Sequence, residues 1–286
     1  MPLLPMRELL IKAKKERYAV PQFNVWNLEW IKTILQTSQK IKTPVILGVS
    51  VNGSKYMGGY KVVMSMIKSL IDCLNISIPV AVHLDHATSV KECFNAIDAG
   101  FTSVMIDASK FDFETNVKMT KEVVDYAHAR NVTVEAELGR IGGKEDYIVA
   151  EEAYAIPDEC VELVKQTNID CLAPALGSVH GIYHGEPKLG FVQMEEISNK
   201  VSLPLVLHGG SGIPDEQIKR AITCGTAKIN VNTDCLIAWK DLMDKYIGDN
   251  PNEIDPRKII GSGLIGIENV VINRCEVFGS IGKAED

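Results

Sequence analysis

Short apolar segments alternate with amphipathic stretches along most of this 286-residue chain, and this alternation limits the folds open to it. Eight segments have the length and apolar character of β-strands, at residues 20–25, 44–51, 79–85, 103–107, 132–138, 171–175, 204–207 and 228–231. The helix-like stretches between them are residues 28–40, 60–74, 90–99, 113–129, 157–166, 193–200, 215–223 and 233–247. Strands that alternate with helices pair in parallel, and eight such units are typical of a closed (β/α)8 barrel. We therefore predict one α/β domain over residues 1–286, a TIM barrel with an additional C-terminal helix; an open doubly wound sheet is the alternative.

Charge and hydropathy exclude several classes of protein. A net charge of −7 and a pI near 5.5 argue against a broad nucleic-acid-binding surface, which requires a basic face. The longest apolar runs are strand-sized and fall short of the roughly 18 residues of a membrane span. The apolar part of residues 1–15 is also too short for a signal peptide. We expect a cytoplasmic protein that binds neither nucleic acid nor membrane.

The seven cysteines are widely scattered and include no Cys-x-x-Cys pair. This spacing argues against a disulfide framework or a zinc–thiolate site and favours buried free thiols.

Two of the connections that follow predicted strands are long. Residues 139–156 follow the fifth strand and combine three glycines with charged side chains, which is typical of a lid, and residues 177–190 follow the sixth strand. Long loops after strands lie on the catalytic face of a barrel. Near the C-terminus, residues 248–258 have the composition of a turn-rich connection to a final helix that ends before residue 278.

Five of the six histidines lie at or just beyond the end of a predicted strand: His83, His86, His180, His184 and His208. One histidine at such a position is usually structural, but five at one end of a barrel favour a site. His86, His180 and His208 follow three different strands and can converge on one cation, and three imidazoles with one open position are typical of catalytic zinc. His83 is expected to support or pack against the site, and His184 stays unassigned.

Three carboxylates accompany these histidines. Asp85 adjoins His86, where an acid beside a metal-bound substrate can move a proton. Asp107 and Glu137 end the fourth and fifth strands, and each has either a structural role or a supporting role at the metal, including an alternative metal position.

Glycine-rich loops follow the seventh and eighth strands. His208 opens the sequence HGGSG, which includes Gly209 and Ser211, and the next strand ends in INVNTD, which includes Asn230, Asn232 and Thr233. Loops at these two places form the usual phosphate pocket of a barrel, because glycines let the backbone approach an anion. Together with the loop at Gly181, they predict a phosphate site.

The motifs FNVWNLE, VILGVS, HLDH, EAELGRIGGKED, GSVHGIYHGEPKLGF, LHGGSGIP, AKINVNT and DPRK follow one another in this order. The chain thereby resembles the class II, zinc-dependent fructose-bisphosphate and tagatose-bisphosphate aldolases over almost its whole length. The resemblance implies zinc at the three histidines, with Asp107 and Glu137 at a second metal position. It implies that Asp85 is the acid/base at the C4 hydroxyl of the substrate, and that Glu145 moves the proton at C3.

The same resemblance implies the remaining binding residues. The C1 phosphate would be held by Gly181, Gly209, Ser211, Asn232 and Thr233, next to His184. Asn230 would contact the ketose near its reacting carbons, with Asn24 and Ser50 also in the pocket. Arg257 would reach the other phosphate across a dimer interface, which implies a homodimer or higher homo-oligomer. A monovalent cation such as sodium would lie near Val179, Gly181 and Gly209.

Three departures from the family pattern bear on the substrate. His184 stands where a lysine is usual, Trp26 where a second asparagine is common, and Ala87 where glycine is common. Fructose 1,6-bisphosphate is the expected substrate, and tagatose bisphosphate or another ketose phosphate is the alternative. A barrel hydrolase is disfavoured because the first strand lacks His-x-His, and a non-catalytic sugar-phosphate-binding relative stays open. A Schiff-base aldolase is disfavoured because Lys228, the one lysine in a predicted strand, is near the wrong end.

Overall fold

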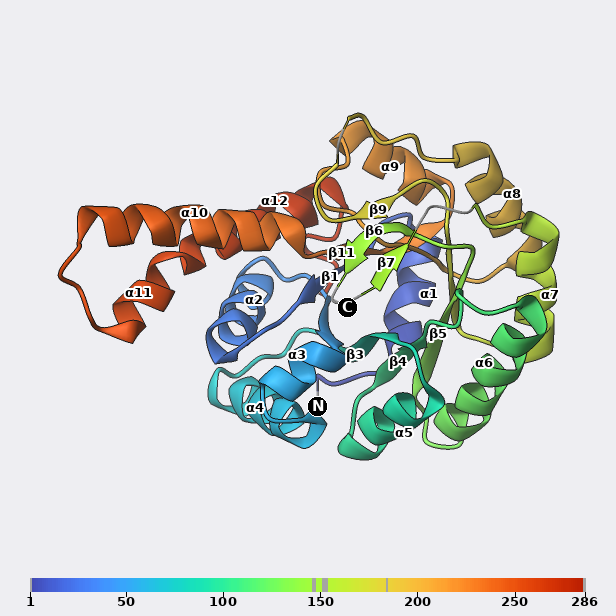
Figure 1. Cartoon of the computed structure of the whole chain (residues 1–286), viewed down its shortest axis with the longest axis horizontal. Helices are drawn as coiled ribbons and strands as arrows, with labels where there is room; N and C mark the ends of the chain where they lie inside the picture. The colour runs from blue at the N-terminus through green and yellow to red at the C-terminus, as the bar shows by residue number, and fades with distance from the viewer. Residues whose placement is uncertain (1, 146–147, 151–153, 184, 285–286) are drawn as a thin grey trace.

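Eight parallel strands close into a barrel in the computed structural model (Figure 1). The structure describes residues 2–145, 148–150, 154–183 and 185–284. For the described residues between 142 and 150 it describes the backbone alone. In barrel order the strands are β1 (Val20–Asn24), β2 (Val45–Ser50), β3 (Val80–Ala87), β4 (Ser103–Ile106), β5 (Thr133–Leu138), β8 (Cys171–Pro174), β10 (Leu205–Leu207) and β11 (Thr226–Val231). The ring closes between β1 and β11, where Gln22 lies opposite Asn230. The predicted (β/α)8 barrel is confirmed, and the open sheet is wrong.

Helices surround the barrel and follow the predicted positions closely. They are α2 (Leu28–Lys40), α4 (Tyr60–Cys73), α5 (Val90–Ala99), α6 (Phe113–His128), α7 (Pro157–Thr167), α8 (Phe191–Val201), α9 (Asp215–Thr223) and α10 (Thr233–Asp249). Side-chain caps fix several of their starts: Asn27 accepts the Trp30 N–H, and Asp112 accepts the Thr115 N–H. A short helix that the sequence did not predict, α3 (Val51–Tyr56), follows β2 and is capped by Ser50. In the described part of the chain, no helix is long and apolar enough to cross a membrane.

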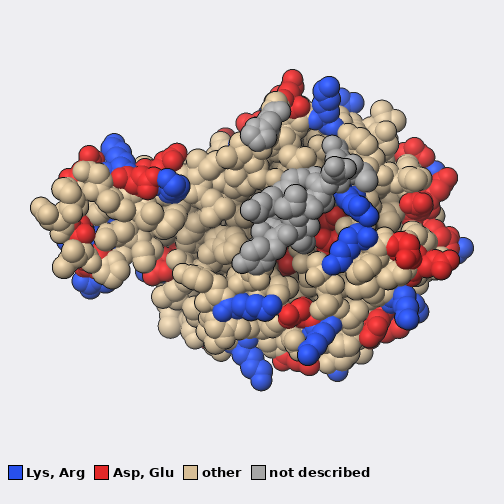
Figure 2. Space-filling view, in the orientation of Figure 1, with Lys and Arg blue, Asp and Glu red and all other residues tan. Residues whose placement is uncertain are grey.

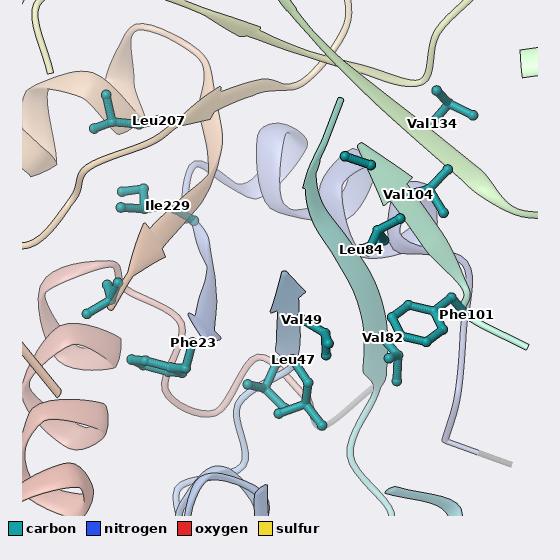
Figure 3. Close-up of a cluster of buried hydrophobic side chains, with 14 of the residues drawn as sticks. Phe23, Leu47, Val49, Val82, Leu84, Phe101, Val104, Val134, Leu207 and Ile229 are labelled. Carbon is teal, nitrogen blue, oxygen red and sulfur yellow. The ribbon is translucent and has the colours of Figure 1, made fainter. Parts of the chain in front are cut away.

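The main hydrophobic core lies between the strands and the surrounding helices. The side chains of Phe23, Leu47 and Leu84 belong to it, together with Ile31 and Ile34 of α2. Figure 3 shows several of the strand residues of this core. Because side chains alternate along a strand, the residues between them face the barrel interior.

Helix α1 (Met6–Glu16) closes the N-terminal end of the barrel. Its buried residues Met6, Leu10 and Ala13 form a second cluster with apolar residues of the strands, including Ile46 and Val206. Helix α1 therefore fills one mouth of the barrel. The opposite mouth, at the carboxyl ends of the strands, therefore remains for functional side chains.

An arm projects from the barrel, formed by α10, α11 (Pro256–Ser262) and α12 (Leu264–Val277) (Figure 1). The sequence predicted a turn-rich connection over residues 248–258 and one final helix. The structure corrects this, because α11 already begins at Pro256, where Asp255 caps it. The last helix ends before Phe278, as predicted. On the face shown in Figure 2, lysine and arginine are interspersed with aspartate and glutamate on both the arm and the barrel.

The expected loop over residues 139–156 contains two short strands instead. β6 (Gly142–Glu145) pairs in antiparallel fashion with β7 (Ile148–Ala150). On its other side, β6 pairs in parallel with β9 (Val179–His180), which lies in the long connection after β8. The two long connections therefore form one three-stranded sheet.

Replacing Leu10 by alanine tests the role of α1. Leu10 is fully buried in the cluster that closes the barrel, so the Leu10→Ala variant is expected to lose about 3 kcal/mol in its free energy of unfolding. Urea denaturation provides the measurement. The neighbouring Ile11 is exposed, and Ile11→Ala is the matched control, with an expected change within about 0.5 kcal/mol. Equal losses in the two variants would contradict a sealing role for this face of the helix.

Candidate active site

Three histidines from three separate elements meet at the carboxyl end of the barrel. His86 lies in β3, His180 in β9 and His208 just after β10. Their ring centroids are 4.5 to 5.8 Å apart, and each ring offers a nitrogen within 4.8 Å of the others. His86 Nε2 is 2.8 Å from His208 Nδ1. The structure thus places these three predicted side chains together.

A β-bulge at the end of β3 makes this convergence possible. In a regular strand Asp85 and His86 would point to opposite faces, with His86 toward the outer helices. Instead, the pairing with β4 shifts register between Leu84 and Ala87, and His86 has a φ of 46°. A positive φ is unusual for a residue other than glycine and is often found at functional sites. The irregularity turns both Asp85 and His86 toward the same site.

Two asparagines hold Asp85 in place. Asn24 Nδ2 donates to one carboxylate oxygen at 3.0 Å, and Asn230 Nδ2 lies 3.4 Å from the other. These asparagines belong to β1 and β11, the pair of strands that closes the barrel. Asp85 is 1% exposed, so these contacts define its orientation without competition from bulk water.

Asp107 and Glu137 flank the opposite nitrogen of His86. His86 Nδ1 lies 3.1 Å from Asp107 Oδ2 and 3.8 Å from Glu137 Oε2. Burial opposes the charge of Asp107, but hydrogen bonds from His86 and Ser109 lower its pKa to about 2. Burial and the charge of Asp107 raise the pKa of Glu137 well above its usual value. His86, Asp107 and Glu137 form a second group whose ligand atoms lie within 4.8 Å of one another.

A buried ion pair that the sequence reasoning missed lies beneath His208. His208 Nε2 is 2.8 Å from Glu135 Oε1, and Lys228 Nζ donates to Glu135 Oε2 at 2.8 Å. Burial opposes the charge of Glu135, but Lys228 and His208 outweigh it and hold the pKa of Glu135 well below its usual value. Burial lowers the pKa of His208, and the nearby His86 lowers it further. Lys228 is fully buried.

His83 is also fully buried and lies beside this ion pair. Its Nδ1 is 2.7 Å from Ser103 Oγ, and its Nε2 is 3.6 Å from Glu135 Oε2. Burial, together with the charge of Lys228, lowers the pKa of His83 to about 3, so the ring is neutral at physiological pH. His83 packs below the three converging histidines and supports their surroundings.

A cleft of about 240 Å³ opens beside the histidines. It is lined by Asn24, Trp26, His180, Gly181, Gly209, Ser211, Asn230, Asn232, Thr233 and Leu236. Seven of the ten predicted substrate-binding residues are therefore gathered in one place. Leu236 was missed, because its position on α10 gives no signal in the sequence.

The loops that bound this cleft touch closely. Gly209 has a φ of 62°, and a Cβ there would lie 2.2 Å from the Val179 carbonyl oxygen. Tyr183 joins the same loops, because its hydroxyl accepts the Val179 N–H and donates to the Gly209 carbonyl at 2.9 Å. This tyrosine was not predicted from the sequence, where its only signal is its place in the motif GIYHG. Only glycine fits at position 209.

The remaining predicted residues lie elsewhere or outside the description. Ser50 is buried and accepts the Gly53 N–H at the start of α3. Arg257 lies on α11 in the arm, with an 88% exposed side chain paired with Asp255. His184 lies outside the described residues. The backbone of Glu145 ends β6, two residues beyond the pairing of Gly143 with His180, and its side chain lies outside the description.

A (β/α)8 barrel with converging histidines and an acid at the strand ends defines a class of metal-dependent barrel enzymes. The family model described as class II fructose-bisphosphate aldolase matches residues 4–283. The chain belongs to this family. It is an aldolase, a carbon–carbon lyase of a metal-dependent family, and its described residues include two groups of side chains that could hold a metal ion.

Proteins with related sequences and structures agree with this assignment. The chain is 58% identical to the fructose-bisphosphate aldolase of Geobacillus stearothermophilus over 99% of each chain. It is 54% identical to the fructose-bisphosphate aldolase of Staphylococcus epidermidis over the full length of both. The crystal structure of the YdjI aldolase from Escherichia coli K12 matches with a TM-score of 0.86 at 34% identity, covering 99% of this chain and 100% of the other.

The raised pKa of Glu137 predicts how stability depends on pH in metal-free protein. The ordinary pKa of a glutamate is 4.5, so above pH 4.5 Glu137 loses its proton in the unfolded chain but retains it in the folded protein. The free energy of unfolding should therefore fall, relative to that of Glu137→Gln, as the pH rises from 4.5 toward the folded pKa. Urea denaturation of both proteins in chelator, at a series of pH values, measures this difference. A difference that stays constant above pH 4.5 would mean that Glu137 is ionised in the fold.

Proposed function

We propose that this aldolase reversibly cleaves a ketose 1,6-bisphosphate, fructose 1,6-bisphosphate first, into dihydroxyacetone phosphate and an aldehyde phosphate. One observation carries the proposal: Asp85 is buried and oriented beside three converging histidines, at the edge of a cleft lined by glycine, serine and asparagine. The histidines can hold a cation and Asp85 can move a proton. The glycine, serine and asparagine residues of the cleft suit a phosphorylated sugar. We assign this activity to a single domain, residues 1–286, in the cytoplasm. Its seven cysteines, all within the described residues, are free thiols, as a reducing compartment favours.

We propose zinc as the ion at His86, His180 and His208. Three imidazole donors suit zinc, and three protein ligands leave a position for substrate. When bound there, the ion would act as a Lewis acid that stabilises the negative charge developing on the ketose as its C3–C4 bond breaks. Asp107 and Glu137 would offer a second metal position. Glu137 Oε2 fits this role, because it is buried without a hydrogen-bond partner among the described residues.

Asp85 and Glu145 would divide the proton transfers. Asp85 would remove the proton of the C4 hydroxyl, which lets the C3–C4 bond break and releases the aldehyde. Glu145 would then protonate C3 to give dihydroxyacetone phosphate, and the groups return their protons in the reverse direction. The two asparagine contacts of Asp85 support this role, because they fix the carboxylate toward one position.

The C1 phosphate would bind where α10 begins. Ser211 Oγ accepts the N–H groups of Asn232 and Asp234, which leaves the hydroxyl proton for an anion. The N-terminal end of α10 adds a favourable dipole, and Thr233, Gly181 and Gly209 border the same cleft.

Other polar atoms of the pocket suit the sugar and a cation. Asn24 and Asn230 each have a buried amide oxygen without a hydrogen-bond partner among the described residues, which suits sugar hydroxyls. Ser50, in β2, is proposed to contact the sugar, and His184 to lie beside the phosphate. A monovalent cation would bind near the backbone oxygens of the Val179, Gly181 and Gly209 loops.

Arg257 would bind the second phosphate from a partner subunit. The described residues that line the cleft include no lysine or arginine, so Arg257 would supply the guanidinium group that pairs with the second phosphate. Arg257 lies on the projecting arm, whose exposed apolar residues include Ile247 and the 89% exposed Ile254. Such exposure suits association of two copies. We therefore propose a homodimer or higher homo-oligomer.

A second candidate substrate is tagatose 1,6-bisphosphate, which differs at C4. Trp26 lines the cleft, and its Nε1 lies 3.4 Å from Asn232 Oδ1. This indole occupies a position where the family commonly has an asparagine, so it changes the shape and hydrogen bonding of the pocket.

A substrate panel with metal removal tests the proposed function. Release of dihydroxyacetone phosphate is measured from fructose 1,6-bisphosphate, tagatose 1,6-bisphosphate and fructose 1-phosphate. We expect the highest kcat/KM for fructose 1,6-bisphosphate, loss of cleavage in chelator, and recovery with zinc. Borohydride with substrate should leave the enzyme active. A trapped lysine adduct would contradict the metal mechanism, and no cleavage of any member would indicate a non-catalytic sugar-phosphate-binding protein.

Mixing two impaired variants tests Asp85 and Arg257 together. Asp85→Ala should keep zinc and lose turnover about 1,000-fold, because only proton transfer is removed. Arg257→Ala should lower kcat/KM about 10- to 100-fold, because one charged hydrogen-bonding group is removed.

If Arg257 acts across the interface, mixed and reassembled subunits should regain about a quarter of wild-type activity. No recovery in verified hybrids would place Arg257 with its own subunit, and loss of zinc from Asp85→Ala would make Asp85 structural.

A further inference from the structure

The ion pair of Glu135 and Lys228 lies inside the barrel, directly below the histidines, and the proposed chemistry leaves it without a task. Both side chains are fully buried. Glu135 is on β5 and Lys228 on β11, on different sides of the barrel ring. Burying two charges costs several kcal/mol each, and a well-packed apolar pair is often no less stable. Stability alone therefore gives little reason for charges at these positions.

The contacts of His208 define which of its ring nitrogens carries the proton. His208 Nε2 faces the Glu135 carboxylate at 2.8 Å, and a carboxylate only accepts hydrogen bonds, so Nε2 is the protonated nitrogen. On the other side, Asn230 Nδ2 lies 3.2 Å from His208 Nδ1, and an amide nitrogen only donates. The two contacts independently assign the lone pair to Nδ1. This is the nitrogen that faces His86.

We propose that Glu135 is a positioning residue: ion-paired with Lys228, it accepts the Nε2 proton of His208 and thereby presents the Nδ1 lone pair to the metal ion. The inference rests on the metal site proposed above. Lys228 acts one step further away, because its ammonium group holds the carboxylate of Glu135 at the place where His208 meets it. Carboxylates that contact metal-binding histidines in this way strengthen metal affinity.

Two substitutions of Glu135 separate its hydrogen bond from its charge. Glu135→Gln retains an acceptor without the charge, and Glu135→Leu removes both. Zinc affinity is measured by competition with a chelator of known affinity, at one pH. We expect affinity to fall about 10-fold in Glu135→Gln and about 100-fold in Glu135→Leu. Wild-type affinity in Glu135→Leu would overturn the proposal.

Lys228→Met and the double variant separate positioning from stability. Lys228→Met leaves the Glu135 charge buried without its partner and should lower both thermal stability and zinc affinity. Adding Glu135→Gln should restore stability while zinc affinity stays low. Val134→Ala, on the outer face of the same strand, is the control: it opens a cavity in the main core and should lower stability with unchanged zinc affinity. Equal loss of zinc affinity in this control would assign the effect to stability and overturn the proposal.

A readout on metal-free protein distinguishes this inference from the metal site itself. The ¹⁵N NMR signals of labelled histidine report which ring nitrogen carries the proton, and His208→Asn assigns the His208 signals. We expect the Nε2–H form in wild-type protein and a mixture of the two forms in Glu135→Leu. An Nδ1–H form in wild-type protein would overturn the inference. Failure of the wild-type protein to bind zinc, with the Nε2–H form intact, would instead refute the metal site.

Discussion

Closure of the barrel between β1 and β11 is the constraint on which the site depends. Parallel pairing puts all eight carboxyl ends at one mouth, and α1 seals the other. The closing pair also brings Asn24 and Asn230 together, so that both reach Asp85 from strands at opposite ends of the sequence. An open sheet would separate β1 from β11 and leave Asp85 without one of these contacts. Local sequence supplies the side chains, but ring closure makes them neighbours.

The interior of this barrel is polar at its middle level, where many barrels are apolar. Gln22, His83, Glu135 and Lys228 are all fully buried there. Gly48 makes room among them, because a Cβ would lie 2.6 Å from Gln22 Nε2. The two charges neutralise each other and His83 is neutral, which lowers the cost of burying these three side chains. Rigid polar packing below the histidines limits the positions that their rings can adopt.

Much of the architecture could be predicted, because the apolar periodicity of each strand and helix is a local property of the sequence. All eight strands were located within a few residues, and α2, α5 and α9 have the predicted bounds. The bulge at His86 could not be predicted, since it arises from register against β4. The Glu135–Lys228 pair was missed because its members are 93 residues apart and no local pattern links them. The sequence predicts a loop where β6 and β7 form, because glycine and charge are typical of loops and β9, which pairs with β6, lies far along the chain.

The three histidines divide between two parts of the structure, and this division links the proposed metal to the proposed proton transfers. His86 lies in β3 of the barrel and His208 directly follows β10, whereas His180 belongs to β9 in the small sheet outside the barrel. The backbone of β9 pairs with β6 at Gly143, two residues before Glu145. An ion held by all three histidines would therefore also fix the strand that carries Glu145 relative to the barrel that carries Asp85. By this geometry, binding of the proposed ion would also help to place the proposed second proton-transfer group.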